Sequence, residues 1–71
     1  MTFGQAIEEL KQGKKMRRSY WKKDAPEIYI YIKNGMFIMR YLNFRNEEKL
    51  EFPPFRSSDY LAEDWEIYED A

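Results

Sequence analysis

The chain has 71 residues, so we expect residues 1–71 to form a single domain with a small hydrophobic core. A core of this size rarely supplies more than about 3–5 kcal/mol, and such domains usually need a disulfide, a metal or a partner subunit. The sequence has no cysteine and no histidine, which excludes disulfides, thiolate metal sites and the commonest general base. We therefore expect a homo-oligomer, either a dimer or a tetramer.

The formal net charge of −1 argues against a basic module for long nucleic acids and against a heavily acidic mimic of DNA. Aromatic residues make up 18% of the chain, a share that suits small cores, interfaces and ligand platforms. No apolar run approaches the roughly 20 residues of a membrane span, and no signal-peptide pattern follows Met1. We expect a cytoplasmic protein that does not enter a membrane.

The first predicted element is a helix over residues 3–12. Thr2 and Gln5 have the spacing of a capping box, and Gly13 supplies the left-handed residue that commonly ends a helix. Apolar side chains recur on one face at helical spacing: Phe3, Ala6, Ile7 and Leu10.

Residues 16–21 are predicted to form a strand, and the polar residues 22–26 a loop. The clearest strand signal is a hairpin of residues 28–33 and 36–41, joined by Asn34-Gly35, a pair that favours the positive φ angles of a two-residue turn. This turn fixes a register in which Ile32 faces Phe37 and Tyr29 faces Arg40. One hairpin face then carries the side chains that we expect the helix to cover: Ile28, Ile30, Ile32, Phe37, Met39 and Tyr41.

Beyond the hairpin, residues 43–49 are predicted to form a polar turn, and residues 50–52 a short strand that Pro53-Pro54 ends. Residues 57–62 can form one helical turn, and residues 65–68 alternate as a closing strand with Trp65 and Ile67 facing inward. The predicted architecture is α+β, with one N-terminal helix packed on a small antiparallel sheet of about four strands.

The sequence contains few side chains of the kinds that catalyse reactions. Without histidine or cysteine, imidazole-based triads and thiol nucleophiles are impossible, and the isolated glycines form no phosphate loop. Neighbouring carboxylates, such as Glu63 and Asp64, are most simply solvated surface groups. We expect no catalytic residue, no metal and no cofactor.

The most informative segment spans residues 14–23, where six cations surround two aromatic side chains. Arginine beside an aromatic ring can hold a flat base and its phosphate together, by stacking and bidentate hydrogen bonds. The candidate ligand-binding residues are Arg17, Arg18, Tyr20 and Trp21. Strand alternation turns Arg17 away from Arg18, so only part of this cluster can share a face. The alternative is a solvated basic edge strand in which Trp21 fills the core.

A second candidate surface is the hairpin face opposite the predicted helix. It carries Tyr29, Tyr31, Ile38 and Arg40, and tyrosine and arginine are enriched at interface hot spots. Because the core is small, we favour a subunit interface over a ligand floor for this face. Both can coexist if a pocket forms where subunits meet.

The two ends of the chain resemble a known family. Residues 1–16, continuing through Arg18 and Trp21, are similar to the start of the small phage and prophage family called Thoeris anti-defence protein 2. Members begin with a phenylalanine-glycine-x-alanine helix, followed by a glycine turn and a strand that bears arginine and ends in tryptophan. Residues 60–67 resemble the leucine-alanine-x-aspartate-tryptophan ending of that family.

The resemblance implies a protein that binds a cyclic nucleotide-type immune signal, such as a cyclic ADP-ribose isomer or a cyclic oligonucleotide, and does not cleave it. It also implies oligomers with pockets at subunit interfaces, acting in the cytoplasm of an infected bacterial host. By matching positions, Trp21 would stack on a base and Arg18 would meet a phosphate. Trp65 matches the terminal tryptophan, and its inward alternation favours a core role.

A different class of function stays open beside this one. The Tyr29, Tyr31 and Arg40 face, together with the acidic end of the chain, would also suit a protein–protein inhibitor of a bacterial defence effector, similar in action to an anti-CRISPR.

Overall fold

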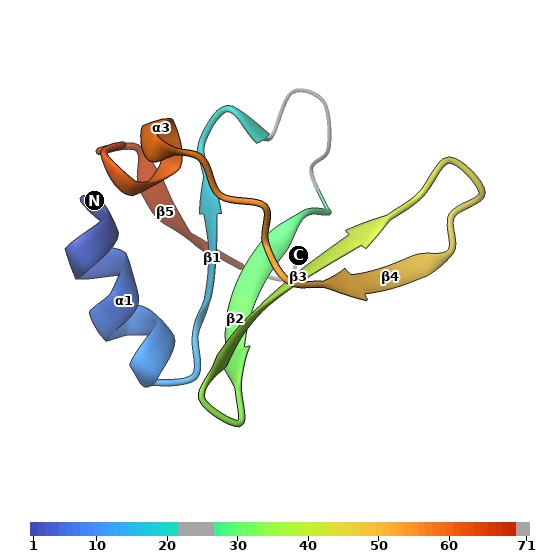
Figure 1. Cartoon of the computed structure of the whole chain (residues 1–71), viewed down its shortest axis with the longest axis horizontal. Coiled ribbons are helices and arrows are strands. Elements are labelled where there is room, and N and C mark those ends of the chain that lie inside the picture. Colours follow the sequence, from blue (N-terminus) through green and yellow to red (C-terminus); the bar gives the residue numbers. More distant parts are fainter. Residues whose placement is uncertain (22–26, 70–71) are drawn as a thin grey trace.

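The computed structural model of the chain describes residues 1–21 and 27–69, which form an α+β fold (Figure 1). Neighbouring strands are antiparallel and follow the order β4-β3-β2-β1-β5. The predicted fold class is confirmed, and the sheet has five strands where about four were expected. The elements are α1 (Phe3–Lys11), β1 (Lys15–Arg18), β2 (Tyr29–Lys33), β3 (Met36–Leu42), β4 (Glu48–Glu51), α3 (Ser57–Tyr60) and β5 (Trp65–Tyr68).

Helix α1 begins and ends where its capping signals predict. The Gln5 amide donates to Thr2 Oγ1 at 3.2 Å, and the Thr2 amide donates to Gln5 Oε1 at 2.9 Å. These reciprocal bonds satisfy amides that have no partner within the helix. Gly13 has φ of 88°, a conformation that glycine adopts without a Cβ penalty.

The β2–β3 hairpin also follows its local rules. Asn34 and Gly35 have φ angles of 53° and 75°, as the predicted two-residue turn requires. The register from Lys33↔Met36 to Tyr29↔Arg40 is the predicted one. Because side chains alternate along a strand, this register fixes which residues share each face of the sheet.

Two predicted strands have an end that lies two or more residues from its place in the structure. Strand β1 ends at Arg18 and not at residue 21, because a turn begins at Ser19, whose amide donates to the Asp64 carbonyl at 3.1 Å. The predicted loop at 22–26 lies outside the described residues. Strand β4 begins at Glu48, since Asn43 Oδ1 accepts the amides of Arg45 and Glu47 and closes the turn early.

The core lies between α1 and the strands β1, β2 and β5, on which the helix packs. Trp65 is 1% exposed, and its indole Nε1–H donates to the Asp59 carbonyl at 2.9 Å, so its predicted core role is confirmed. Ile67 packs against the same cluster. Tyr41 is beyond the core, and its hydroxyl donates to Glu51 at 2.7 Å. The buried apolar residues are Ala6, Leu10, Met16, Ile30 and Trp65.

Replacing one buried and one exposed methionine tests which side chains form the core. Met16 is fully buried whereas Met36 is 47% exposed, so they form a matched pair. We expect Met16→Ala to lower the free energy of unfolding by about 2–5 kcal/mol, enough to unfold much of a small domain. Met36→Ala should cost less than about 1 kcal/mol. Urea titrations followed by circular dichroism measure both; equal losses would contradict the assigned core.

Candidate functional site

Strand β1 sends its two arginines to opposite faces of the sheet. The Arg18 guanidinium carbon lies 4.7 Å from the Tyr20 ring centroid, on the face covered by α1 and α3. The Arg17 guanidinium carbon lies 5.2 Å from the Tyr68 ring centroid, on the open face. The four predicted ligand residues are therefore not brought together. Tyr20 and Trp21 line one pocket, and Arg17 belongs to a different surface.

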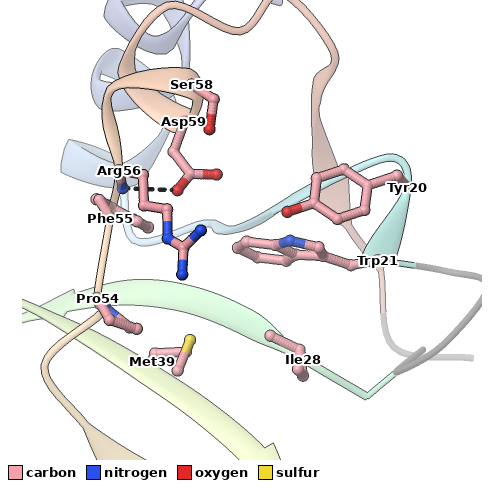
Figure 2. A pocket seen from close by; sticks show the side chains of 9 residues that line it. All are labelled: Tyr20, Trp21, Ile28, Met39, Pro54, Phe55, Arg56, Ser58 and Asp59. Atoms are coloured by element: carbon pink, nitrogen blue, oxygen red, sulfur yellow. Dashed lines mark hydrogen bonds between the residues drawn. The ribbon is translucent and has the colours of Figure 1, made fainter.

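Tyr20 and Trp21 form one wall of a cavity of about 300 Å³ (Figure 2). The opposite wall is the segment that leads into α3, and the sheet forms the floor. The lining residues are Tyr20, Trp21, Ile28, Met39, Pro54, Phe55, Arg56, Ser58 and Asp59.

The Trp21 indole is half-buried and is anchored from behind by the core. Its ring centroid lies 5.7 Å from that of Trp65, edge to face at 81°, and 6.3 Å from that of Tyr20. Figure 2 shows the indole extending into the cavity toward the side chain of Arg56. One part of the Trp21 side chain packs against the core, as the alternative prediction has it, and another part borders the pocket.

Arg56 is the functional candidate that sequence reasoning missed. Its guanidinium extends into the cavity from the wall opposite Trp21 (Figure 2), and no ion pair holds it within residues 1–21 and 27–69. Its backbone N–H donates to Asp59 Oδ2 at 2.9 Å, which fixes the chain direction at this point. The only local signal was the position of Arg56 directly before the helical turn predicted from residue 57.

Arg18 is held behind the pocket wall by two carboxylates. Its Nη1–H donates to Asp59 Oδ1 at 2.6 Å, and its Nε–H donates to Asp64 Oδ1. With a side chain only 12% exposed, Arg18 ties β1 to α3 and to the start of β5. This geometry favours a positioning role for Arg18, and its contact with a ligand phosphate stays a prediction.

Asp64 has a pKa below its ordinary value. Burial by itself raises the pKa of this carboxyl, but hydrogen bonds from Arg18 and Ser19 and the charge of Arg18 outweigh that effect. The Ser19 hydroxyl donates to Asp64 Oδ2 at 2.9 Å. The ionised carboxylate is therefore the form that the folded chain stabilises.

The open face of the sheet carries the predicted interface residues side by side. Tyr29 pairs with Arg40 and Tyr31 with Ile38 across the hairpin, and the Tyr29 and Tyr68 rings lie 4.7 Å apart between centroids. Lys15 Nζ and the Arg40 guanidinium carbon approach the Tyr29 ring at 4.8 and 5.7 Å. Cations and a neighbouring ring already cover these π faces, so the surface suits protein contact better than base stacking.

The described residues offer no metal site and no membrane span. Within residues 1–21 and 27–69, no three acidic side chains are grouped to hold a metal ion. No helix in the same part of the chain is both long and apolar enough to cross a bilayer.

Taken together, the fold and the pocket define a small α+β domain with an aromatic and basic cavity on one side of the sheet and an aromatic face on the other. The family model of the Thoeris anti-defense 2-like domain matches residues 1–68. The chain belongs to this family, which assigns it a role against Thoeris defence. No curated protein matches the chain.

The Asp64 carboxylate should make stability depend on pH. Because its folded pKa is depressed, its contribution is fully present above the unfolded value of 3.8 and is lost as pH falls through the folded pKa. We expect Asp64→Asn to be less stable than wild type at pH 7 and to lose less stability below about pH 4. Urea midpoints across this range measure the effect. Glu63→Gln makes the same charge change one residue earlier, and its stability should depend on pH as that of the wild type does.

Proposed function

We propose that the chain opposes Thoeris defence by binding a cyclic nucleotide-type immune signal and holding it intact. The signal class is a cyclic ADP-ribose isomer or a cyclic oligonucleotide. The observation that carries the proposal is the placement of the Trp21 ring and the Arg56 guanidinium on opposite walls of one cavity (Figure 2).

Such a cavity matches the two chemical features of a nucleotide. An indole stacks on the flat face of a base, and a guanidinium donates a fork of hydrogen bonds to a phosphate. Met39, Phe55 and Ile28 supply apolar contact around the ring. At about 300 Å³ the cavity lies at the lower end of the range for ligand pockets, so a base and its nearest phosphate are the parts that it encloses.

The side chains around the cavity support retention over cleavage. Asp59 is 8% exposed, and its two carboxylate oxygens accept hydrogen bonds from Arg18 and from the Arg56 amide. A carboxylate committed in this way is a poor general base. Among the described residues, no hydrogen bond joins the Ser58 hydroxyl to a base that would activate it. We therefore propose sequestration and not catalysis.

Self-association is part of this proposal. The small core gives a single copy little stability, and Tyr29, Tyr31, Ile38 and Arg40 form a continuous aromatic and basic surface on the open face. We propose that this surface contacts other copies of the chain.

Substitutions at Trp21 test the stacking contact. We expect Trp21→Ala to weaken binding of the signal by about 5–150-fold, the range for loss of one base-stacking ring, and Trp21→Phe to retain most of it. Isothermal calorimetry with cyclic ADP-ribose isomers and cyclic di- and trinucleotides measures the affinity, and circular dichroism confirms folding. Mass spectrometry of the released molecule should show it unchanged; a hydrolysed product would overturn sequestration.

Arg56 provides the test of the charged contact. Arg56→Ala should weaken binding by about tenfold or more, because it removes the guanidinium that the cavity directs at a phosphate. The matched control is Lys11→Ala, which makes the same charge change at an exposed site on α1 and should bind as wild type does. If both variants bind equally well, or if no signal in the panel binds the wild type, the proposed pocket is wrong.

A second candidate function is inhibition of a defence effector through the open face. The Tyr29–Tyr68 ring pair with its three flanking cations favours it, because such groups resemble interface hot spots. In that case Tyr31→Ala would weaken a defined complex with a Thoeris component, and Trp21→Ala would leave it intact. Sequestration predicts instead that Trp21→Ala weakens binding of the signal and that Tyr31→Ala leaves it intact.

A further inference from the structure

We infer that the end of the cavity nearest α3 is a ribose subsite, in which the Tyr20 and Ser58 hydroxyls and the Asp59 carboxylate bind the sugar hydroxyls of the ligand. This inference rests on the proposed function and deepens it, because it assigns the sugar of a nucleotide to named side chains. It makes the cavity selective for ribonucleotides over nucleotides whose sugar lacks these hydroxyls.

The ring of Tyr20 is already engaged by other side chains of the protein. The Arg18 guanidinium carbon lies 4.7 Å from its centroid, and the Trp21 ring meets it edge to face at 74°. Tyr20 is nevertheless 51% exposed, and Figure 2 shows its hydroxyl on the side of the ring that faces Arg56 and Asp59 across the cavity. The hydroxyl is therefore the part of Tyr20 that is best placed to meet a ligand.

Three polar side chains border this end of the cavity and retain capacity for hydrogen bonds. Within the part of the chain that the structure describes, the Tyr20 and Ser58 hydroxyls form no hydrogen bond with another residue. The Asp59 carboxylate accepts one bond at each oxygen, from Arg18 Nη1–H and from the Arg56 amide. Because a carboxylate has about four acceptor positions, Asp59 can accept a further bond from a ligand.

The chemistry of these groups favours a sugar hydroxyl over a phosphate. A sugar hydroxyl both donates and accepts, so it can donate to Asp59 and accept from Tyr20 or Ser58. A phosphate in the same place would have no proton to donate and would be repelled by the charge of Asp59. Carboxylates bind ribose hydroxyls in the same way in dinucleotide-binding folds.

The position of the three groups suits the order of parts in a nucleotide, where the sugar joins the base to the phosphate. Figure 2 shows the three groups on one side of the line from the Trp21 indole to the Arg56 guanidinium, and the apolar floor on the other side. A nucleotide with its base on the indole and its phosphate at the guanidinium would turn its sugar hydroxyls toward the polar side.

The test compares adenosine 5′-monophosphate with its 2′,3′-dideoxy analogue, which differ only in the two sugar hydroxyls. Titrations of the isotope-labelled full chain, followed by the NMR signal of the Trp21 indole N–H, give both dissociation constants. We expect the wild type to bind the ribonucleotide about 3–10-fold more tightly, the range for one or two neutral hydrogen bonds.

Two variants assign this difference to the inferred subsite. Tyr20→Phe and Ser58→Ala should each bring the ratio of the two constants closer to one, by weakening binding of the ribonucleotide and leaving that of the analogue unchanged. A merely structural role would weaken both equally. The matched controls are Tyr60→Phe and Ser57→Ala, which remove the same hydroxyls from residues that do not line this cavity and should keep the wild-type ratio.

Three results would overturn the inference: equal affinities of the wild type for the two nucleotides, no binding of either, or a wild-type ratio in both Tyr20→Phe and Ser58→Ala. Calorimetry of the wild type with the cyclic signals reports on the proposed function separately. A cyclic signal that binds alongside any of these results leaves sequestration standing without the ribose subsite, whereas a panel in which nothing binds contradicts both.

Discussion

The Arg18 guanidinium, held between the Asp59 and Asp64 carboxylates, is the interaction on which the site depends. It joins the end of β1 to α3 and to the start of β5, whose carboxylates lie 41 and 46 residues further along the chain. A largely buried cation of this kind is tolerated because its Nε and Nη1 donors bond to two carboxylates, and removing one partner from such a cluster typically costs about 3–5 kcal/mol. Within the described residues, no buried side-chain nitrogen or oxygen lacks a hydrogen-bond partner.

The same cluster explains how the pocket wall is held in place. Asp59 also accepts the Arg56 amide, and its carbonyl accepts the Trp65 indole N–H. Trp65 in turn supports the ring of Trp21 from the core side. Both walls of the cavity thus rest on one buried network, so the Trp21 ring and the Arg56 backbone are positioned before any ligand arrives, which lowers the ordering cost of binding.

The sequence predicted the elements that short-range chemistry specifies. The Thr2–Gln5 capping box and the Asn34-Gly35 turn act over a few residues, and the hairpin register follows from the turn alone. The site was predicted only in part. Tyr20 and Trp21 do line the cavity, but Arg56 reaches it through the path of the chain after β4, which no local pattern encodes. Alternation correctly separated Arg17 from Arg18, although only the fold shows that Arg17 lies over Tyr68.

The outer strands of the sheet have a consequence for how copies of the chain can aggregate. Strand β4 is four residues long and every one of them is exposed, with Glu48, Lys49 and Glu51 charged, and β5 is equally short. Short, charged border strands are poor templates for unlimited backbone pairing. The borders of this sheet are thereby protected against growing into fibrils.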